Sequence, residues 1–420
     1  MGIKSVFSPA VRFLYNRIVS PIEDRISLRR IRQAERRRGI GERIKVAFLV
    51  QMPEIWDKQA SVYQAMVDDA RFDPWLVIVP GYDLAGETVG VYGDEKTFFL
   101  EQYPDANVLL ARQGDGWIDM GRYHFDYVFY QRPYNELLPK PLQSNQLIRV
   151  TKTCYIPYAS TEWKDTSTYP RGFIRNMYFA FLEDASAESY CTSCFGESGH
   201  KQFWNIGYPC FEKCLSMKKA SEYARVLWTP RWSYDPRFGG SHFMEYNDPL
   251  TDYPWGEHRL TVRPHPLMWS NFIKTGLLTE TQAADIRERW TKAGVRTDVN
   301  KDILETFDET DVLISDRSSV IPMFFLTGKP VIYCPIETEY SWLFSAILPG
   351  LYLADSWEEL NALLDKLLQG DDPLRPVRER IIRDTFLYHD HATERIITTI
   401  LRDASPGKKN YERQVLSIVL

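Results

Sequence analysis

Short apolar runs alternate with longer amphipathic stretches along most of the chain. The first run, residues 44–50, reads Ile-Lys-Val-Ala-Phe-Leu-Val and predicts a buried strand. Further strands are predicted at residues 74–79, 127–130, 153–156 and 190–192, and a helix at residues 57–69. Strands separated by helices indicate a parallel sheet covered on both faces. The pattern therefore predicts a Rossmann-like domain in the first half of the chain.

The same alternation starts again after the turn Gly207-Tyr208-Pro209 and a polar stretch that contains Lys218, Lys219 and Ser221. Strands are predicted at residues 224–228, 259–262, 295–299, 311–315 and 330–333, and helices at 281–293, 320–326 and 357–368. The expected fold is thus α/β, with two Rossmann-like doubly wound domains at residues 44–220 and 221–388. We expect a hinge near residue 220. A final helix at residues 391–402, within segment 389–420, is expected by fold analogy to cross back to the first domain.

Residues 1–43 form a basic segment ahead of the first strand. Val6, Val11, Leu14, Ile18 and Ile22 recur at helical spacing, and a run of arginines follows. Residues 1–45 carry twelve Lys or Arg against four Asp or Glu, whereas the whole chain has a net charge of −5. We therefore expect an amphipathic helical arm, which either associates with an anionic membrane surface or packs on the body as a solvated helix. The acidic remainder argues against a nucleic-acid-binding body.

Composition and cysteine content narrow the class of protein. With 420 residues and 44% apolar content, the chain can bury a core in each of two domains. No apolar run is long enough to span a membrane, so we expect a cytoplasmic protein, peripheral at the inner face of the cell membrane. Cys191, Cys194, Cys210 and Cys214 come close to a zinc-ligand spacing, but their places in regular elements favour buried thiols over a metal site.

Three polar turns follow predicted strands of the second domain, where open α/β sheets bind their ligands. They are Trp228-Thr229-Pro230-Arg231-Trp232-Ser233, Val262-Arg263-Pro264-His265-Pro266 and Ser315-Asp316-Arg317-Ser318-Ser319. Ser318 and Ser319 precede a predicted helix, so they form either a phosphate cradle or an ordinary helix cap. The two prolines beside His265 are expected to present its ring, and Arg263 is either a second cation for an anionic ligand or a surface charge.

Several spaced segments together resemble the CDP-glycerol glycerophosphotransferases. Arg263-Pro264-His265-Pro266 is similar to the family's His-Pro motif, and residues 311–319 followed by Lys329-Pro330-Val331-Ile332-Tyr333 resemble its donor segment. Residues 390–396 look like its closing helix, and Asn205-Ile206-Gly207-Tyr208-Pro209 resembles its inter-domain turn. The order and spacing agree over roughly residues 220–400. The first domain agrees only in outline.

The resemblance implies a fold of the two-Rossmann-domain type known as GT-B, working without a cofactor or bound metal. It implies transfer of a polyol phosphate from a CDP-linked donor to a lipid-linked or polymer acceptor at the membrane, in teichoic-acid-like or capsule-like polymer synthesis. On this basis His265 is the expected catalytic residue. The expected donor-binding residues are Arg231, Arg263, Asp316, Ser318 and Ser319.

The chain departs from the family pattern at several positions. Arg317 replaces a tyrosine, Arg231 stands where the family often has threonine, and Pro322-Met323 replaces Phe-Asp. The first domain has residues 154–160, without a histidine, at the expected place of the family's histidine segment, so Glu183 or Asp184 is left as a base without local support. Two alternatives stay open: a GT-B glycosyltransferase that uses a nucleotide sugar, and a non-catalytic polymer-assembly protein of the same fold.

Overall fold

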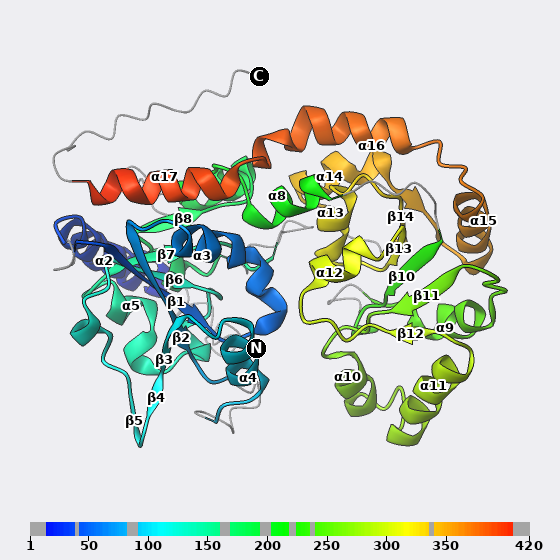
Figure 1. Ribbon diagram of the computed structural model, residues 1–420, viewed down its shortest axis with the longest axis horizontal. Coiled ribbons are helices and arrows are strands. Elements are labelled where there is room, and N and C mark those ends of the chain that lie inside the picture. The colour runs from blue at the N-terminus through cyan, green and yellow to red at the C-terminus, as the bar shows by residue number, and fades with distance from the viewer. Residues whose placement is uncertain are drawn as a thin grey trace. The chain divides into compact units, whose positions relative to one another are not determined.

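We describe the protein from a computed structural model, in which residues 14–37, 42–81, 91–159, 169–193, 203–217, 224–235, 240–335 and 340–405 are described. The chain divides into two compact units (Figure 1). One unit comprises Met1–Tyr158, Thr166–Tyr208 and Ala392–Leu420, and the other comprises Ala159–Asp165 and Pro209–His391. The chain therefore passes between the units after Tyr208 and again before Ala392, in addition to the short segment Ala159–Asp165. Val6, Val11, Cys194 and the polar stretch 218–223 lie outside the described residues.

The first unit is built on a parallel sheet with strand order β3-β2-β1-β6-β7-β8-β9. The strands are β1 (Ile44–Val50), β2 (Phe72–Ile78), β3 (Asn107–Leu110), β6 (Tyr127–Tyr130), β7 (Lys152–Tyr155), β8 (Phe179–Phe181) and β9 (Phe203–Trp204), with β4 (Arg112–Gln113) and β5 (Gly116–Trp117) forming a small hairpin. The helices are α2 (Ser20–Ala34), α3 (Ala60–Val67), α4 (Asp94–Gln102), α5 (Ser144–Leu147), α6 (Arg171–Ile174), α7 (Ala185–Ser193) and α17 (Ala392–Ala404). Every residue of β1 except Lys45 is buried, as a central parallel strand requires.

The final helix, α17, packs on α3 of the first unit. The side chain of its Asp403, only 5% exposed, accepts hydrogen bonds from Tyr127 Oη (2.5 Å), Lys152 Nζ (2.6 Å) and Tyr178 Oη (2.7 Å). Tyr127 and Lys152 begin β6 and β7, so this carboxylate ties the last helix to the amino ends of two central strands. Because a buried charge is tolerated only with such partners, Asp403 fixes where the end of the described chain lies in this unit.

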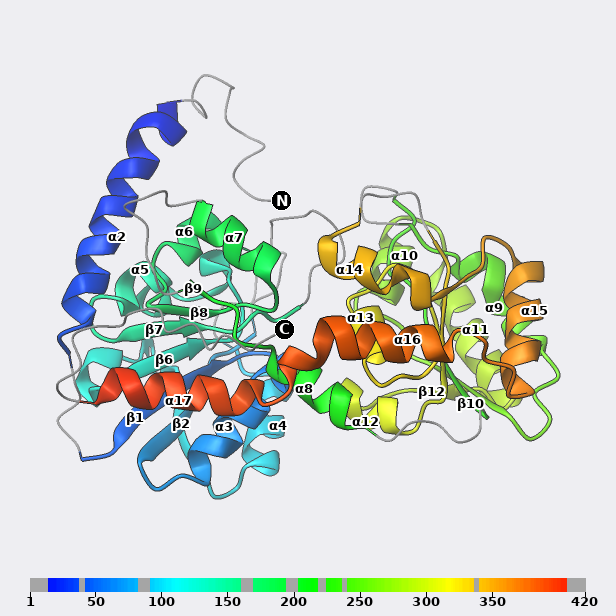
Figure 2. The same cartoon turned by 90° about the horizontal axis from the view of Figure 1, so that it is seen from above.

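Helix α2 lies along one flank of the first unit (Figure 2) and continues from the π-helical turn η2, Tyr15–Val19. Its inward positions include buried Ser27 and Ile31, and the Ser27 hydroxyl donates to Asn176 Oδ1 at 2.7 Å. Arg175 pairs with Glu23 of the helix. The predicted amphipathic helix is therefore present over the described residues, and it is held to the body by a largely polar face. Among the described residues, no helix is both long and apolar enough to cross a membrane.

The second unit contains a parallel sheet in the order β12-β11-β10-β13-β14-β15. Its strands are β10 (Arg225–Thr229), β11 (Arg259–Val262), β12 (Arg296–Thr297), β13 (Val312–Ser315), β14 (Val331–Tyr333) and β15 (Tyr352–Leu353). Its helices are α8 (Pro209–Ser216), α9 (Phe243–Asp252), α10 (Met268–Lys274), α11 (Glu280–Lys292), α12 (Ile303–Asp308), α13 (Val320–Phe325), α14 (Trp342–Ile347), α15 (Trp357–Leu368) and α16 (Arg375–Ile381). The strand order reverses between β10 and β13, which makes this the switch point of a doubly wound sheet.

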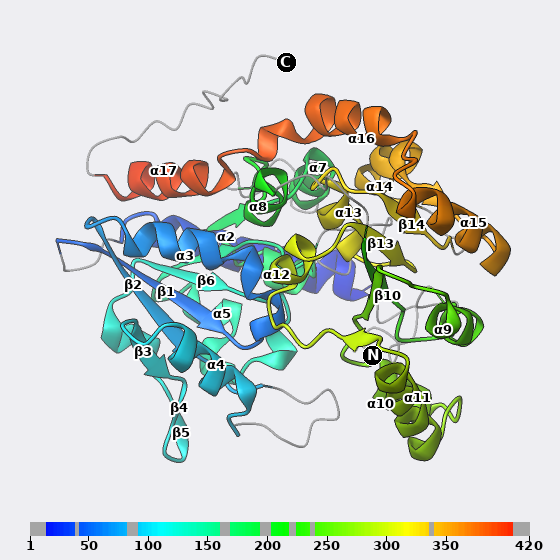
Figure 3. The same cartoon turned by 45° about the vertical axis from the view of Figure 1, so that its right-hand side comes forward.

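Helices cover the second sheet unequally. Residues of α9, α10, α11 and α15 share one apolar core with β10, β11 and β13. The short helices α12 and α13 lie on the other face (Figure 3). The side chains of Val226 and Trp228 join the first core, so the alternate positions of β10, Arg225 and Thr229, point to the face of α12.

One strand prediction was wrong, and another gave too long a strand. Residues 190–192 lie inside α7, which begins after Asp184 because the Asp184 carboxylate accepts a hydrogen bond from the Ala187 backbone N–H at 2.8 Å. The strand of this region is β8, a short aromatic run that periodicity could not separate from its surroundings. The strand predicted at 295–299 contains only Arg296–Thr297, at the edge of the sheet.

Candidate functional site

The site predicted at the strand ends lies at the switch point of the second sheet. Thr229 ends β10 and Ser315 ends β13, and the two residues are paired across these strands. The Thr229 hydroxyl donates to Ser315 Oγ at 2.7 Å. Arg231 follows β10 and Asp316 follows β13, so the two segments that contain them begin next to each other. This is the position where doubly wound sheets hold their ligands.

Asp316 organises this part of the site. Its side chain is buried, and its carboxylate accepts hydrogen bonds from the Arg231 backbone N–H (2.9 Å) and the Ser241 hydroxyl (3.3 Å). It also contacts the ring of His242, with 2.7 Å between Oδ1 and Nδ1. These partners all belong to the segment that leaves β10. The Asp316 carboxylate is thus occupied by hydrogen-bond donors of the protein, and it positions Arg231, Ser241 and His242.

Sequence reasoning missed His242. Burial lowers the pKa of His242, but the hydrogen bond to Asp316 and the charges of Asp316, Glu245 and Asp355 outweigh it, so the pKa is raised. The ring stacks on Tyr246 with 5.1 Å between centroids. With Nδ1 directed at Asp316, the other nitrogen, Nε2, has no hydrogen-bond partner among the described residues. The raised pKa of His242 favours the protonated ring, and in that form Nε2 presents an N–H.

Arg231 lies between the two loops of the switch point. Its guanidinium Nη1 donates to the Arg317 carbonyl oxygen at 2.8 Å, which brings it to the segment that contains Ser318 and Ser319. The Ser318 hydroxyl accepts a hydrogen bond from the Val320 N–H (3.3 Å), whereas Ser319 makes no side-chain cap. Both serines are half-buried. Helix α13 begins directly after them, as predicted, and ends one residue earlier than expected.

His265 lies beside the same loop. Its ring centroid is 6.0 Å from that of Trp232, next to Arg231. The Leu267 backbone N–H donates to His265 Nδ1 at 3.1 Å, so the neutral ring carries its proton on Nε2. Surrounding protein atoms desolvate the ring and Arg231 repels its charge, which together lower the pKa of His265 to about 4. The residue nevertheless stays open to solvent, so a neutral N–H donor is available to a ligand.

Arg263 is turned away from this group. Its guanidinium forms an ion pair with the buried side chain of Asp298 and donates to the Asn300 carbonyl oxygen at 3.0 Å. Arg231, Asp316 and the segment 317–319 are thus linked by direct contacts, with His265 beside them, whereas Arg263 is linked to the loop after β12. The pairing neutralises the charge that made Arg263 a donor-binding candidate.

The other polar candidates are buried. Glu183 is buried and accepts a hydrogen bond from Tyr169 Oη, and Asp184 caps α7. Cys191 belongs to the first unit, whereas Cys210 and Cys214 belong to the second, and all three side chains are buried. In the part of the chain that the structure describes, no group of three or more His, Cys, Asp or Glu side chains could hold a metal ion.

The fold is shared with solved structures of low sequence identity. A putative UDP-N-acetylglucosamine 2-epimerase from Listeria monocytogenes matches with a TM-score of 0.57 and 12% identity, covering 88% of this chain and 98% of that one. A variant of the wall teichoic acid polymerase TagF matches with a TM-score of 0.56 and 13% identity, covering 95% and 98%. The UDP-GlcNAc 2-epimerase from Neisseria meningitidis, bound to UDP-GlcNAc, matches with a TM-score of 0.54 and 12% identity, covering 85% and 100%.

No protein-family model and no curated protein matches the sequence. The structural matches extend over nearly the whole length of each protein and define the class of fold. The chain has the two-domain α/β fold that the strand pattern predicted, and it is of the GT-B type that the resemblance implied. At 12–13% sequence identity, these structural matches establish the fold alone. The reaction has to be argued from the residues of the site.

Proposed function

We propose that the protein transfers a polyol phosphate, glycerol phosphate or a similar unit, from a CDP-linked donor to an acceptor hydroxyl during synthesis of a cell-surface polymer. The observation that carries this proposal is the cluster at the β10–β13 switch point, where Arg231 contacts the segment that leads to Ser318 and Ser319. Ser318 and Ser319 lie in a segment that resembles the CDP-glycerol glycerophosphotransferases, whereas Arg231 stands where that family often has threonine. TagF and UDP-N-acetylglucosamine 2-epimerases share this fold to the same extent, so the proposal rests on the site.

In the proposed site the donor diphosphate lies among cations and neutral donors. Arg231 supplies positive charge, and His265 donates from Nε2 because its Nδ1 is occupied by the Leu267 N–H. Ser318 and Ser319 add hydroxyls at the start of α13. Asp316 acts as a positioning residue through its bonds from the Arg231 N–H and the Ser241 hydroxyl. For phosphoryl transfer, such pre-arranged charge and hydrogen bonds supply most of the catalysis.

The reaction that this arrangement serves is a single displacement at phosphorus. The acceptor hydroxyl oxygen attacks the phosphorus that carries the polyol, and the bond from that phosphorus to the bridging oxygen of the diphosphate breaks. CMP leaves with the bridging oxygen, and the hydroxyl proton passes to a base or to water. Charge accumulates on the CMP phosphate as the bond breaks, so Arg231 and His242, both held by Asp316, are the cations that we assign to it.

We also propose that the protein works at an anionic membrane surface, where a lipid-linked acceptor is available. Leu14, Ile18, Ile22 and Ile26 lie on the outward side of η2 and α2, and each is more than 40% exposed. Arg25 and Arg29 continue that side toward the end of the helix and are exposed. Apolar side chains followed by arginines on one helix face are typical of helices that lie in a membrane interface.

The identity of the released nucleotide tests the reaction. The protein is incubated with CDP-glycerol and a short glycerol-phosphate oligomer, and the nucleotides are separated. CMP is expected in step with elongation of the oligomer. Release of CDP would mean transfer of the glycerol without its phosphate, as a glycosyltransferase acts on a nucleotide sugar. If neither nucleotide is released from CDP-glycerol or from nucleotide sugars, the protein is the non-catalytic assembly component.

A further inference from the structure

Strand β11 carries a polar row on one side. Leu260 and Val262 are buried in the apolar core, whereas Arg259 is exposed and Thr261 is half-buried. Successive side chains alternate between the two faces of a strand, so Arg259 and Thr261 point to the face of α12. Strands of parallel sheets are usually apolar on both faces. A row of polar side chains here indicates that this part of the sheet face is kept open rather than packed.

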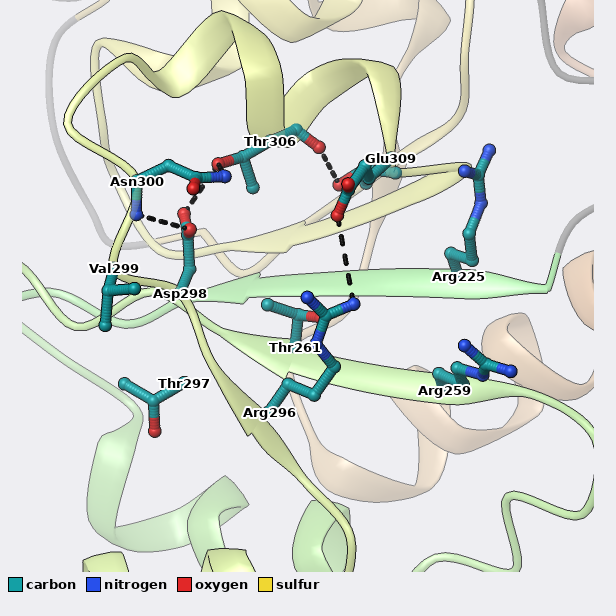
Figure 4. A pocket seen from close by; sticks show the side chains of 11 residues that line it. Arg225, Arg259, Thr261, Arg296, Thr297, Asp298, Val299, Asn300, Thr306 and Glu309 are labelled. Atoms are coloured by element: carbon teal, nitrogen blue, oxygen red, sulfur yellow. Dashed lines mark hydrogen bonds and ion pairs between the residues drawn. The ribbon is translucent and has the colours of Figure 1, made fainter.

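An open cavity of about 280 Å³ lies over this row, along β10, β11 and β12 and beside α12 (Figure 4). Arg225 and Arg259 project to the same side from neighbouring strands. The lining also contains Arg296, Thr261, Thr297 and Asn300. The volume is close to the lower limit of about 300 Å³ for ligand cavities, so one small molecule fits.

The charges that line the cavity do not cancel. Arg225 is neutralised by a two-point ion pair with Asp311, and Asp298 is neutralised by Arg263. Arg296 is 3.8 Å from Glu309, and both side chains are more than 60% exposed, so this pair is weak. Arg259 forms no ion pair with any described residue. The cavity therefore has an excess of positive charge centred on Arg259.

We propose that this cavity binds a small organic phosphate that carries hydroxyl groups, a phosphorylated polyol. Arg259 and Arg296 would hold the phosphate, because guanidinium groups match its geometry. The hydroxyl of Thr261 and the amide of Asn300 would hydrogen bond to the polyol. The cavity lies on the face of the sheet and contains none of the switch-point residues Arg231, His265 or Ser318. It is thus a second anion site, and the proposal does not rest on the transfer reaction.

Titration calorimetry with sn-glycerol 3-phosphate, inorganic phosphate and glycerol tests the proposal. Glycerol 3-phosphate is expected to bind most tightly, phosphate more weakly, and glycerol not at all. Arg259→Ala should weaken glycerol 3-phosphate binding at least tenfold, with an unchanged unfolding temperature because this side chain has no described partner. Arg380→Ala, which removes another exposed arginine of the same unit, should leave the affinity unchanged.

His265→Ala separates this site from the switch point. If the cavity is the binding site, this variant binds glycerol 3-phosphate as the wild type does. The proposal is overturned if Arg259→Ala keeps the wild-type affinity, or if His265→Ala loses binding and Arg259→Ala does not. Equal affinity for glycerol 3-phosphate and inorganic phosphate would overturn the assignment of the polyol contacts.

Discussion

The ring of His242 lies 2.7 Å, measured from Nδ1, from the buried carboxylate of Asp316 at the end of β13. The same carboxylate holds the backbone of Arg231, so the two cations share one anchor. A histidine paired in this way keeps its proton to higher pH than a free imidazole, whose pKa is about 6.5. This pair gives the proposed donor site a charge that depends on pH.

We predict that binding of CDP-glycerol weakens as the pH rises through the raised pKa of His242 and the ring loses its proton. The sign follows from the raised pKa of His242, because the imidazolium exists below that pKa and is lost above it. His242→Asn, which keeps an N–H for Asp316 but cannot titrate, should bind severalfold more weakly at low pH and show a flat profile. Titration calorimetry from about pH 6 to 9 measures this. An identical pH profile in wild type and variant would exclude His242 from the donor site.

Asp316→Ala is expected to destabilise the second unit. The substitution leaves the Arg231 N–H, Ser241 and His242 without their buried acceptor, and breaking a buried pair costs about 3–5 kcal/mol. Asp248→Ala is the control, since Asp248 is 65% exposed in its pair with Arg289 and such pairs contribute about 0–1 kcal/mol. Urea unfolding compares the two. A similar loss of unfolding free energy in both variants would show that Asp316 does not hold the segment of Arg231, Ser241 and His242.

His265→Ala should reduce transfer by roughly a hundredfold or more, the scale seen when one pre-arranged charge-stabilising donor is removed. The residue is open to solvent and follows the end of β11, so its loss should change the unfolding free energy by about 0.5 kcal/mol or less. Initial rates and thermal unfolding are measured on the same preparation. A variant that melts earlier but turns over normally per folded molecule would assign His265 to the loop alone, through its bond from Leu267.

Membrane association is predicted to depend on the outward side of α2. The inward side is bonded to the body through Ser27 and Glu23, so removal of residues 1–40 would also remove contacts that stabilise the first unit. Point substitutions on the outward side leave those contacts in place. Ile18→Asn with Ile22→Asn should release the protein from vesicles that contain anionic lipid. Val299→Asn is the control, since Val299 is 81% exposed and lies in the second unit. Equal sedimentation of the wild type and the double variant with vesicles would contradict the proposal.

Local patterns were sufficient for the main features of the fold. The runs at β10 and β13 predicted both strands to within one residue, and the polar turns after them supplied Arg231 and Asp316, which the structure joins. Chain direction explains this success, since the carboxyl ends of parallel strands lie on one edge.

Contacts between distant segments could not be predicted. His242 follows β10 by more than ten residues, and only its bond to Asp316 brings it to the site. Arg263 was predicted to bind the donor because its partner, Asp298, lies in the loop after another strand, β12, and could not be identified from the local sequence. The prediction of a strand at 190–192 failed because Asp184 caps a helix, α7, that contains these residues.

A crystal structure of the protein with bound CDP-glycerol tests the central claim most directly. We predict that the diphosphate lies beyond the ends of β10 and β13, with oxygens within hydrogen-bond distance, about 2.7–3.2 Å, of His265 Nε2 and of the Ser318 or Ser319 hydroxyl. Arg231 should contact the same phosphates. A diphosphate bound elsewhere in the second unit, or one that contacts neither His265 nor Arg231, would contradict it.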